Sequence, residues 1–125
     1  MSMHDVTELK YLQKQRCLHI TFAEKGLYQL SSEYLRVFTP SAERLEHKAG
    51  PGVLIPGKKH VNIIAIEPVG QYAVKLTFDD GHNTGIYSWT YLFELAETQQ
   101  KNWQDYLARL TEANASREPE AIDGK

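Results

Sequence analysis

The sequence of 125 residues has a single cysteine, Cys17, no long apolar run and no large excess of charge of either sign. One cysteine cannot form an intramolecular disulfide, and the N-terminus lacks the basic and apolar regions of a secretion signal. The longest apolar stretches, such as residues 63–66, fall far below the roughly 20 residues that a membrane-spanning helix needs. A formal net charge of −2 provides no basic field for nucleic acid or an anionic membrane. We therefore expect a cytoplasmic protein that binds neither.

Length and composition are those of one globular domain. The chain has 42% hydrophobic and 24% charged residues, which is sufficient for a core. From residue 114 onward there is no apolar face, and this stretch contains Pro119 and Gly124. We predict a domain over residues 1–113 and a mobile tail over residues 114–125.

Alternation of apolar and polar residues predicts several strands. Leu18, Ile20 and Phe22 share one face of a strand, and residues 6–12 are apolar enough to pair with it. Residues 23–26 then provide a turn before residues 27–30. Two stronger strands are predicted over residues 61–66 and 72–78, with a tight antiparallel connection at residues 68–70.

Helical signals lie in the middle and at the end of the chain. Ser31 or Ser32 can cap a short helix over residues 31–37, and residues 39–59 form a long surface connection with three prolines and three glycines. After Ser88, two apolar stripes follow with helical spacing, and residues 98–102 either break or continue this helix. The stripes comprise Trp89, Leu92, Phe93 and Ala96, then Trp103, Tyr106, Leu107 and Leu110.

These elements predict an α+β fold. We expect a small antiparallel, twisted β-sheet of about five or six strands with one or two C-terminal helices packed against it. The aromatic residues of the helical stripes are assigned to core packing, because large rings are usually buried on such a face.

Motifs of catalysis are weak or missing. The segment from Gly52 to Lys59 has the glycine and lysine spacing of a phosphate-binding loop, but it ends in lysine where a hydroxyl should bind magnesium, and Pro56 removes a backbone donor. No histidine forms the ligand pairs of iron oxygenases or zinc proteases. Cys17 lies within a strand pattern, and no acid–base pair or activated nucleophile can be named. A small-molecule enzyme is therefore the weakest functional hypothesis.

One segment, residues 78–92, combines more special residues than a turn requires. Two acids, a glycine and a histidine follow a strand, and aromatic residues lead from them into a helix. Such turns can be purely structural, yet loops on a rigid scaffold are also where binding residues gather. The candidate contact residues are Asp79, Asp80, Gly81, His82, Tyr87 and Trp89.

The same segment resembles the hallmark of the γ-butyrobetaine hydroxylase N-terminal-like domain family. The resemblance covers about residues 7–98 in order and includes Ser32-Glu33-Tyr34-Leu35-Arg36, Ser41-Ala42-Glu43 and Ile66-Glu67-Pro68-Val69-Gly70-Gln71-Tyr72-Ala73-Val74.

In the hydroxylases, this domain precedes an iron and 2-oxoglutarate oxygenase domain and holds a structural zinc through three cysteines and one histidine. The resemblance places that histidine at His82 and the cysteines at Thr39, Ser41 and Arg44, none of which is a thiolate ligand. Structural zinc is therefore not expected, and the oxygenase domain has no counterpart in this sequence.

The family also includes free-standing bacterial members, and domains fused to P-loop ATPases with iron–sulfur clusters, which are similar to this sequence in lacking the cysteines. The resemblance therefore implies a non-catalytic accessory or adaptor domain of iron-dependent systems. Its expected partner is a protein, either a metalloprotein or the machinery that assembles one, and no cofactor is expected. The alternative is a metal-binding protein that holds iron or zinc through His82 with Asp79 or Asp80, and with His47 or His60 from the long connection.

Overall fold

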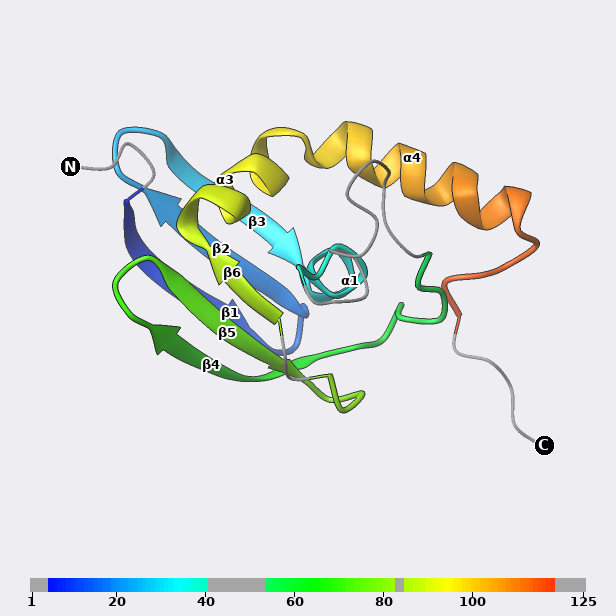
Figure 1. Cartoon of the computed structure of the whole chain (residues 1–125), viewed down its shortest axis with the longest axis horizontal. Helices are drawn as coiled ribbons and strands as arrows, with labels where there is room; N and C mark the ends of the chain where they lie inside the picture. Colours follow the sequence, from blue (N-terminus) through cyan, green and yellow to red (C-terminus); the bar gives the residue numbers. More distant parts are fainter. Residues whose placement is uncertain (1–4, 41–53, 83–84, 119–125) are drawn as a thin grey trace.

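The computed structural model describes residues 5–40, 54–82 and 85–118 (Figure 1). In these residues, six strands form two antiparallel three-stranded sheets with the orders β1-β2-β3 and β4-β5-β6. The predicted α+β class is confirmed, with helices at the C-terminal end. The strands are divided between two sheets instead of one, because a helix and a long connection separate β3 from β4 and replace the hairpin that would pair them.

The first sheet consists of β1 (Val6–Leu12), β2 (Cys17–Phe22) and β3 (Gly26–Ser31). All three strands lie where the alternating pattern predicts them. The edge strand β1 has a shift of register between Val6 and Glu8. The predicted inner face of β2 is confirmed, since its apolar residues are fully buried: Leu18, Ile20 and Phe22.

The second sheet consists of β4 (Ile63–Val69), β5 (Ala73–Phe78) and β6 (Gly85–Ser88). β4 begins two residues later than predicted and continues through Pro68, which an edge strand tolerates because one side of it donates no ladder hydrogen bonds. It also has a shift of register between Ile63 and Ala65. β6 was not predicted, because four residues are too few to display a period.

Three helices are described, and side-chain caps begin two of them. Ser31 accepts a hydrogen bond from the N–H of Tyr34 at the start of α1 (Ser32–Val37), and Ser88 accepts one from Tyr91 at the start of α3 (Trp89–Glu97). Thr98 separates α3 from α4 (Gln99–Glu112), so the helix is interrupted at this residue. None of the helices in the described ranges is long and apolar enough to cross a membrane.

The core lies between the inner faces of the two sheets. Helix α3 contacts β3 and β6, which are edge strands of different sheets, and so covers one side of the stack (Figure 1). A smaller cluster joins α1 to α4 through Val37, Ile55, Tyr106 and Leu110. Of the predicted second stripe, Tyr106 and Leu110 are buried, whereas Leu107 is partly exposed.

The start of the predicted tail returns to the domain. The N–H groups of Gly57 and Lys59 each donate to a carbonyl of this segment, those of Ser116 and Arg117, at 2.9 Å. The guanidinium of Arg117 also binds the carboxylate of Glu33 in α1 through two contacts of 2.8 Å. Residues 119–125 of the tail and residues 41–53 of the predicted connection lie outside the described residues.

Candidate functional site

The turn after β5, residues 79–82, is closed at its base by backbone hydrogen bonds. The N–H of Phe78 donates to the carbonyl of His82 at 2.9 Å, and the N–H of Gly81 donates to the carbonyl of Phe78 at 3.1 Å. Gly81 has a φ of +93°, which residues with a side chain rarely adopt. The turn therefore requires glycine and holds both of its acids at the end of β5.

Asp80 is the centre of a cluster of ion pairs that we call the Asp80 clamp: Asp80, Arg36 and Lys58. Its Oδ2 lies 2.8 Å from Nε of Arg36 and 2.6 Å from Nζ of Lys58, and its Oδ1 accepts from the N–H of His82 at 3.0 Å. Partial burial alone raises the pKa of Asp80, but hydrogen bonds from Lys58, the His82 backbone and Arg36 outweigh it and lower that pKa to about 2. The ionised carboxylate thus connects β5 to α1 and to residue 58.

Asp79 and His82 contact different parts of the chain. Asp79 exchanges two hydrogen bonds with Asn62, whose N–H lies 3.1 Å from Oδ1 of Asp79 and whose carbonyl accepts from the Asp79 N–H at 2.9 Å. Nε2 of His82 lies 3.1 Å from the hydroxyl of Thr39, which is fully buried. Thr39 and His82, which the resemblance matches to one cysteine and to the histidine of the hydroxylases' zinc site, are thus neighbours in space.

Gly85 lies against the same threonine. A Cβ at residue 85 would be 2.6 Å from the hydroxyl oxygen of Thr39, closer than real Cβ atoms essentially ever come, and 3.0 Å from the ring of Tyr87, which is also tight. Only glycine therefore allows β6 to pass the Thr39–His82 contact.

Metal binding through His82 would need ligands from beyond the turn. Within residues 5–40, 54–82 and 85–118, no group of three His, Cys, Asp or Glu side chains is placed to hold an ion. Both oxygens of Asp80 already accept hydrogen bonds, and His60 faces Glu118 at 3.7 Å. The metal-binding hypothesis stays a prediction, and one of its residues, His47, lies outside the described ranges. So do Ser41 and Arg44, which the resemblance matches to two of the zinc-binding cysteines.

The predicted contact residues do not form a single surface. Tyr87 is fully buried, and its hydroxyl donates to the carbonyl of Leu35, so this residue belongs to the core. Trp89 lies at the opposite end of β5 from the Asp80 turn, where its N–H donates to the carbonyl of Tyr72 and its indole donates to Gln71. The reason is β6, which runs antiparallel to β5 and carries the chain along the length of the sheet.

The second sheet also exposes large apolar side chains. We call the exposed apolar residues of its strands and of the β4–β5 turn the outer patch: Ile64, Val69, Tyr72 and Ile86. Tyr72 is 73% and Ile64 is 61% exposed. Lys75 of β5 lies opposite Ile86 in the ladder and forms an ion pair with Glu67 of β4 at 3.5 Å. Large exposed apolar side chains on one sheet are candidates for a surface that binds a protein.

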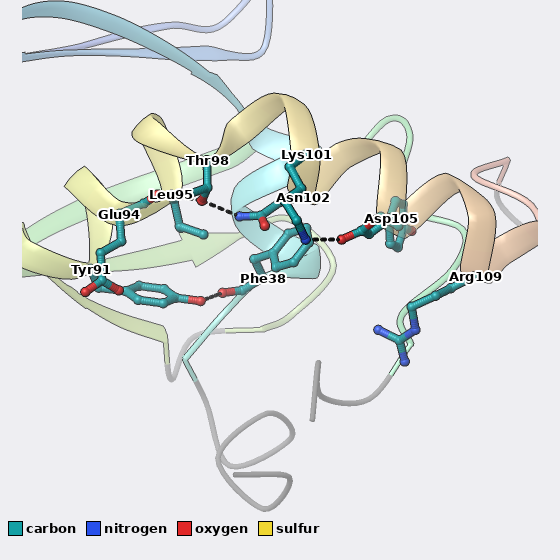
Figure 2. A pocket seen from close by; sticks show the side chains of 10 residues that line it. Phe38, Tyr91, Glu94, Leu95, Thr98, Lys101, Asn102, Asp105 and Arg109 are labelled. Atoms are coloured by element: carbon teal, nitrogen blue, oxygen red, sulfur yellow. Dashed lines mark hydrogen bonds and ion pairs between the residues drawn. The ribbon is translucent and has the colours of Figure 1, made fainter. Parts of the chain in front are cut away.

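A cavity of about 330 Å³ lies between the end of α1 and the helices α3 and α4 (Figure 2). The hydroxyl of Tyr91 donates to the carbonyl of Phe38 in its wall, and Lys101 binds Asp105 at 3.0 Å. Since these polar groups bind one another, we assign the cavity no ligand.

A larger cavity, of about 630 Å³, lies between the β1–β2 turn, α1 and the start of α4. Sequence reasoning missed both cavities, because their walls come from segments that are far apart along the chain.

Solved structures with the same architecture cover nearly all of this chain. Two are NMR solution structures: one is 53% identical, covers 97% of this chain and 90% of its own with a TM-score of 0.80, and the other is 40% identical, covers 99% and 98% with a TM-score of 0.82. A crystal structure from Acidithiobacillus ferrooxidans ATCC 23270 is 36% identical over 75% of this chain and 94% of its own, with a TM-score of 0.64.

That crystal structure is of a protein with unknown function from the DUF971 family. The sequence model of the family described as gamma-butyrobetaine hydroxylase-like, N-terminal, matches residues 9–93. No protein with a curated function matches the chain.

Proposed function

The chain belongs to the γ-butyrobetaine hydroxylase-like N-terminal domain family, and from this premise we propose that it is a non-catalytic adaptor domain that binds a protein. The observation that carries the proposal is the outer patch, where four large apolar side chains are exposed on one sheet and its turn. Burial of such side chains is the main favourable term in protein association. A partner that covers the patch would remove this apolar surface from water.

The composition of the outer patch suits an interface. Tyrosine and isoleucine supply large contact areas. The Glu67–Lys75 pair lies beside Ile86 in the ladder and is exposed enough to bind partner groups. Trp89 hydrogen-bonds to the backbone of Tyr72, so one predicted contact residue lies next to a residue of the outer patch. We therefore assign protein binding to the outer patch and a supporting role to the Asp80 clamp.

Three groups whose pKa values are strongly shifted are poorly suited to acid–base chemistry. A general acid or base works best with a pKa near the ambient pH. The pKa of Asp80 is about 2, and burial raises the pKa values of Tyr34 and Tyr106 to about 12. None of these groups exchanges a proton readily near neutral pH.

The proposed partner is a metalloprotein or the machinery that assembles one. This part of the proposal rests on the resemblance to domains that precede iron-dependent hydroxylases or are fused to iron–sulfur ATPases. On this proposal, the chain acts in iron-dependent systems without carrying out the oxygenase reaction.

Affinity capture followed by reconstitution tests the adaptor proposal. A protein captured from cell extract is identified and purified, and its dissociation constant is measured with the natural chain and with a Tyr72→Ser, Ile86→Ser variant. We expect this variant to bind at least about tenfold more weakly, because two interface anchors are lost. Leu107→Ser is the matched control, since it removes a partly exposed apolar residue from α4. Equal affinity of all three proteins would reject the outer patch.

Elemental analysis separates the adaptor proposal from the metal-binding alternative. The untagged protein is purified anaerobically without chelators, in parallel with His82→Ala. Near-stoichiometric iron or zinc that disappears in the variant would replace the adaptor proposal with metal binding. Equal metal content in both proteins would rule out His82 as an essential ligand.

A further inference from the structure

The larger cavity is built by five segments that the fold brings together. The β1–β2 turn contributes Arg16, α1 contributes Glu33 and the first turns of α4 contribute Trp103. Lys59 and Arg117 come from two further segments, which pair with each other through backbone hydrogen bonds. Its volume of about 630 Å³ is within the range of small-ligand sites. It shares no lining residue with the outer patch, so its role is independent of the proposed adaptor function.

One acid of the cavity is already neutralised. The Glu33 side chain is only 6% exposed, and both of its oxygens accept hydrogen bonds from Arg117 at 2.8 Å. The same guanidinium lies 5.3 Å from the ring centroid of Trp103, so ion pairing and a cation–π contact together hold it in place. The positive charge of Arg117 is therefore used within the protein.

Two further cations remain for a ligand. Arg16 makes no ion pair within the described part of the chain, although it lines the cavity. Its unusual φ of +52° is fixed by its own carbonyl, which accepts from the N–H of Ser32 at 2.8 Å and from the Ser32 hydroxyl. Lys59 pairs with Glu118 at 2.7 Å, but both side chains are exposed, and such pairs exchange readily with other anions.

The remaining polar lining consists of amides. Gln99, Gln100 and Gln104 from α4 and Gln15 from the β1–β2 turn face the same cavity. A primary amide both donates and accepts hydrogen bonds, so it matches the N–H and C=O groups of another amide. The lining thus offers cations that can bind a negatively charged group and glutamine side chains that can hydrogen-bond to amides.

We propose that this cavity binds a ligand in which a carboxylate adjoins amide groups, with Arg16 and Lys59 holding the carboxylate and the glutamines holding the amides. This chemistry is shared by acylated amino acids and by the C-terminal end of a peptide. A single negative charge fits better than the double charge of phosphate, because Glu33 cancels the charge of Arg117 and leaves only Arg16 and the exposed Lys59 to hold an anion.

NMR titration of the ¹⁵N-labelled chain with acetyl-trialanine tests this site. We expect saturable shifts of the Arg16 amide and of the Trp103 indole N–H, and at least about tenfold weaker binding of acetyl-trialanine amide, which lacks the charge. Arg16→Gln should weaken binding of the acid by about tenfold. Lys14→Gln removes one charge from the same turn without lining the cavity, and it should change the affinity less than about twofold.

Each contrary result is decisive. Equal binding of the acid and the amide would overturn the carboxylate assignment, and equal losses in Arg16→Gln and Lys14→Gln would reduce it to non-specific charge attraction. Tighter binding of inorganic phosphate than of acetyl-trialanine would also overturn the ligand class. If the carboxylate assignment holds, acetylglycine distinguishes the two kinds of ligand. Tighter binding of acetyl-trialanine than of acetylglycine would indicate the C-terminal end of a peptide, and the reverse order would indicate an acylated amino acid.

Discussion

Two carboxylates that bind an arginine in the described part of the chain, Asp80 and Glu33, differ in what surrounds them. Both oxygens of Asp80 have partners, because Oδ2 binds two cations and Oδ1 accepts from a backbone N–H. Glu33 has one arginine, and the cavity beside it also contains Arg16, which makes no ion pair within the described residues. Both oxygens of Asp80 therefore bind protein groups, whereas the cavity beside Glu33 keeps a positive charge that is available to a ligand.

This difference shows how to distinguish a structural cluster from a binding site. The density of acids, glycine and histidine in residues 79–82 marks a place where the fold needs special residues, and they are used internally. The cavity beside Glu33 has no comparable local motif, yet it retains cationic and amide groups for a ligand. Unsatisfied interaction capacity, and not local residue density, is the better sign of binding.

The largest effect should come from breaking the Asp80 clamp with Asp80→Asn. This change removes an anionic partner from the buried guanidinium of Arg36, and we expect a loss of about 3 kcal/mol of unfolding free energy in urea denaturation. Asp79→Asn is the control, because the amide oxygen can still accept from Asn62, and it should cost less than about 0.5 kcal/mol. Equal losses in both variants would contradict the clamp.

Acid should weaken the clamp as well. The pKa of Asp80 in the folded state, about 2, lies below its ordinary value of 3.8, so the unfolded chain binds more protons between these values and stability rises with pH there. The contribution of about 2 kcal/mol is complete above pH 5 and is lost as the pH falls from about 4 to 2. Denaturation of the natural chain and of Asp80→Asn should therefore converge over this range, and a constant difference would argue against ionisation as the cause.

A smaller effect is expected at the second carboxylate. Glu33→Gln should cost about 1.5 kcal/mol, because Arg117 is 37% exposed and water can replace part of the lost contact. A double-mutant cycle with Arg117→Gln measures the coupling directly. Additive losses in that cycle would mean that the two side chains do not stabilise each other.

The smallest effect on stability should come from Arg16→Gln. Its side chain makes no ion pair within the described ranges, and the turn is held by its backbone carbonyl, so the unfolding free energy should change by less than about 0.5 kcal/mol. Thermal denaturation checks this. A large loss of unfolding free energy would show that Arg16 stabilises the fold. The contrast between the Asp80 clamp and the cavity beside Glu33 would then no longer hold.

Local interactions made much of the fold predictable from the sequence. The caps at Ser31 and Ser88 depend on residues three positions away, and the buried face of β2 depends on a period of two. The family could also be recognised, since its motifs run in order through the region that the family model matches. The division into two sheets and the strand β6 depend on tertiary pairing, which periodicity does not report.

The sites were harder to predict for the same reason. Glu33 and Arg117 are 84 residues apart along the chain, so nothing near either residue indicates the pair. Tyr87 was expected at a surface because it follows a polar turn, but the direction of β6 places it in the core. The sequence indicated Asp80 and His82 as candidate binding residues, but it did not show which residues of the chain they contact.

The strand edges that α3 does not cover have a consequence for behaviour at high concentration. β1 and β4 are the outer strands of their sheets, and each is interrupted by a shift of register, with Pro68 as a further interruption in β4. Irregular edges of this kind offer a poor template for another chain to extend the ladder. The fold thus has built-in protection against strand-mediated polymerisation.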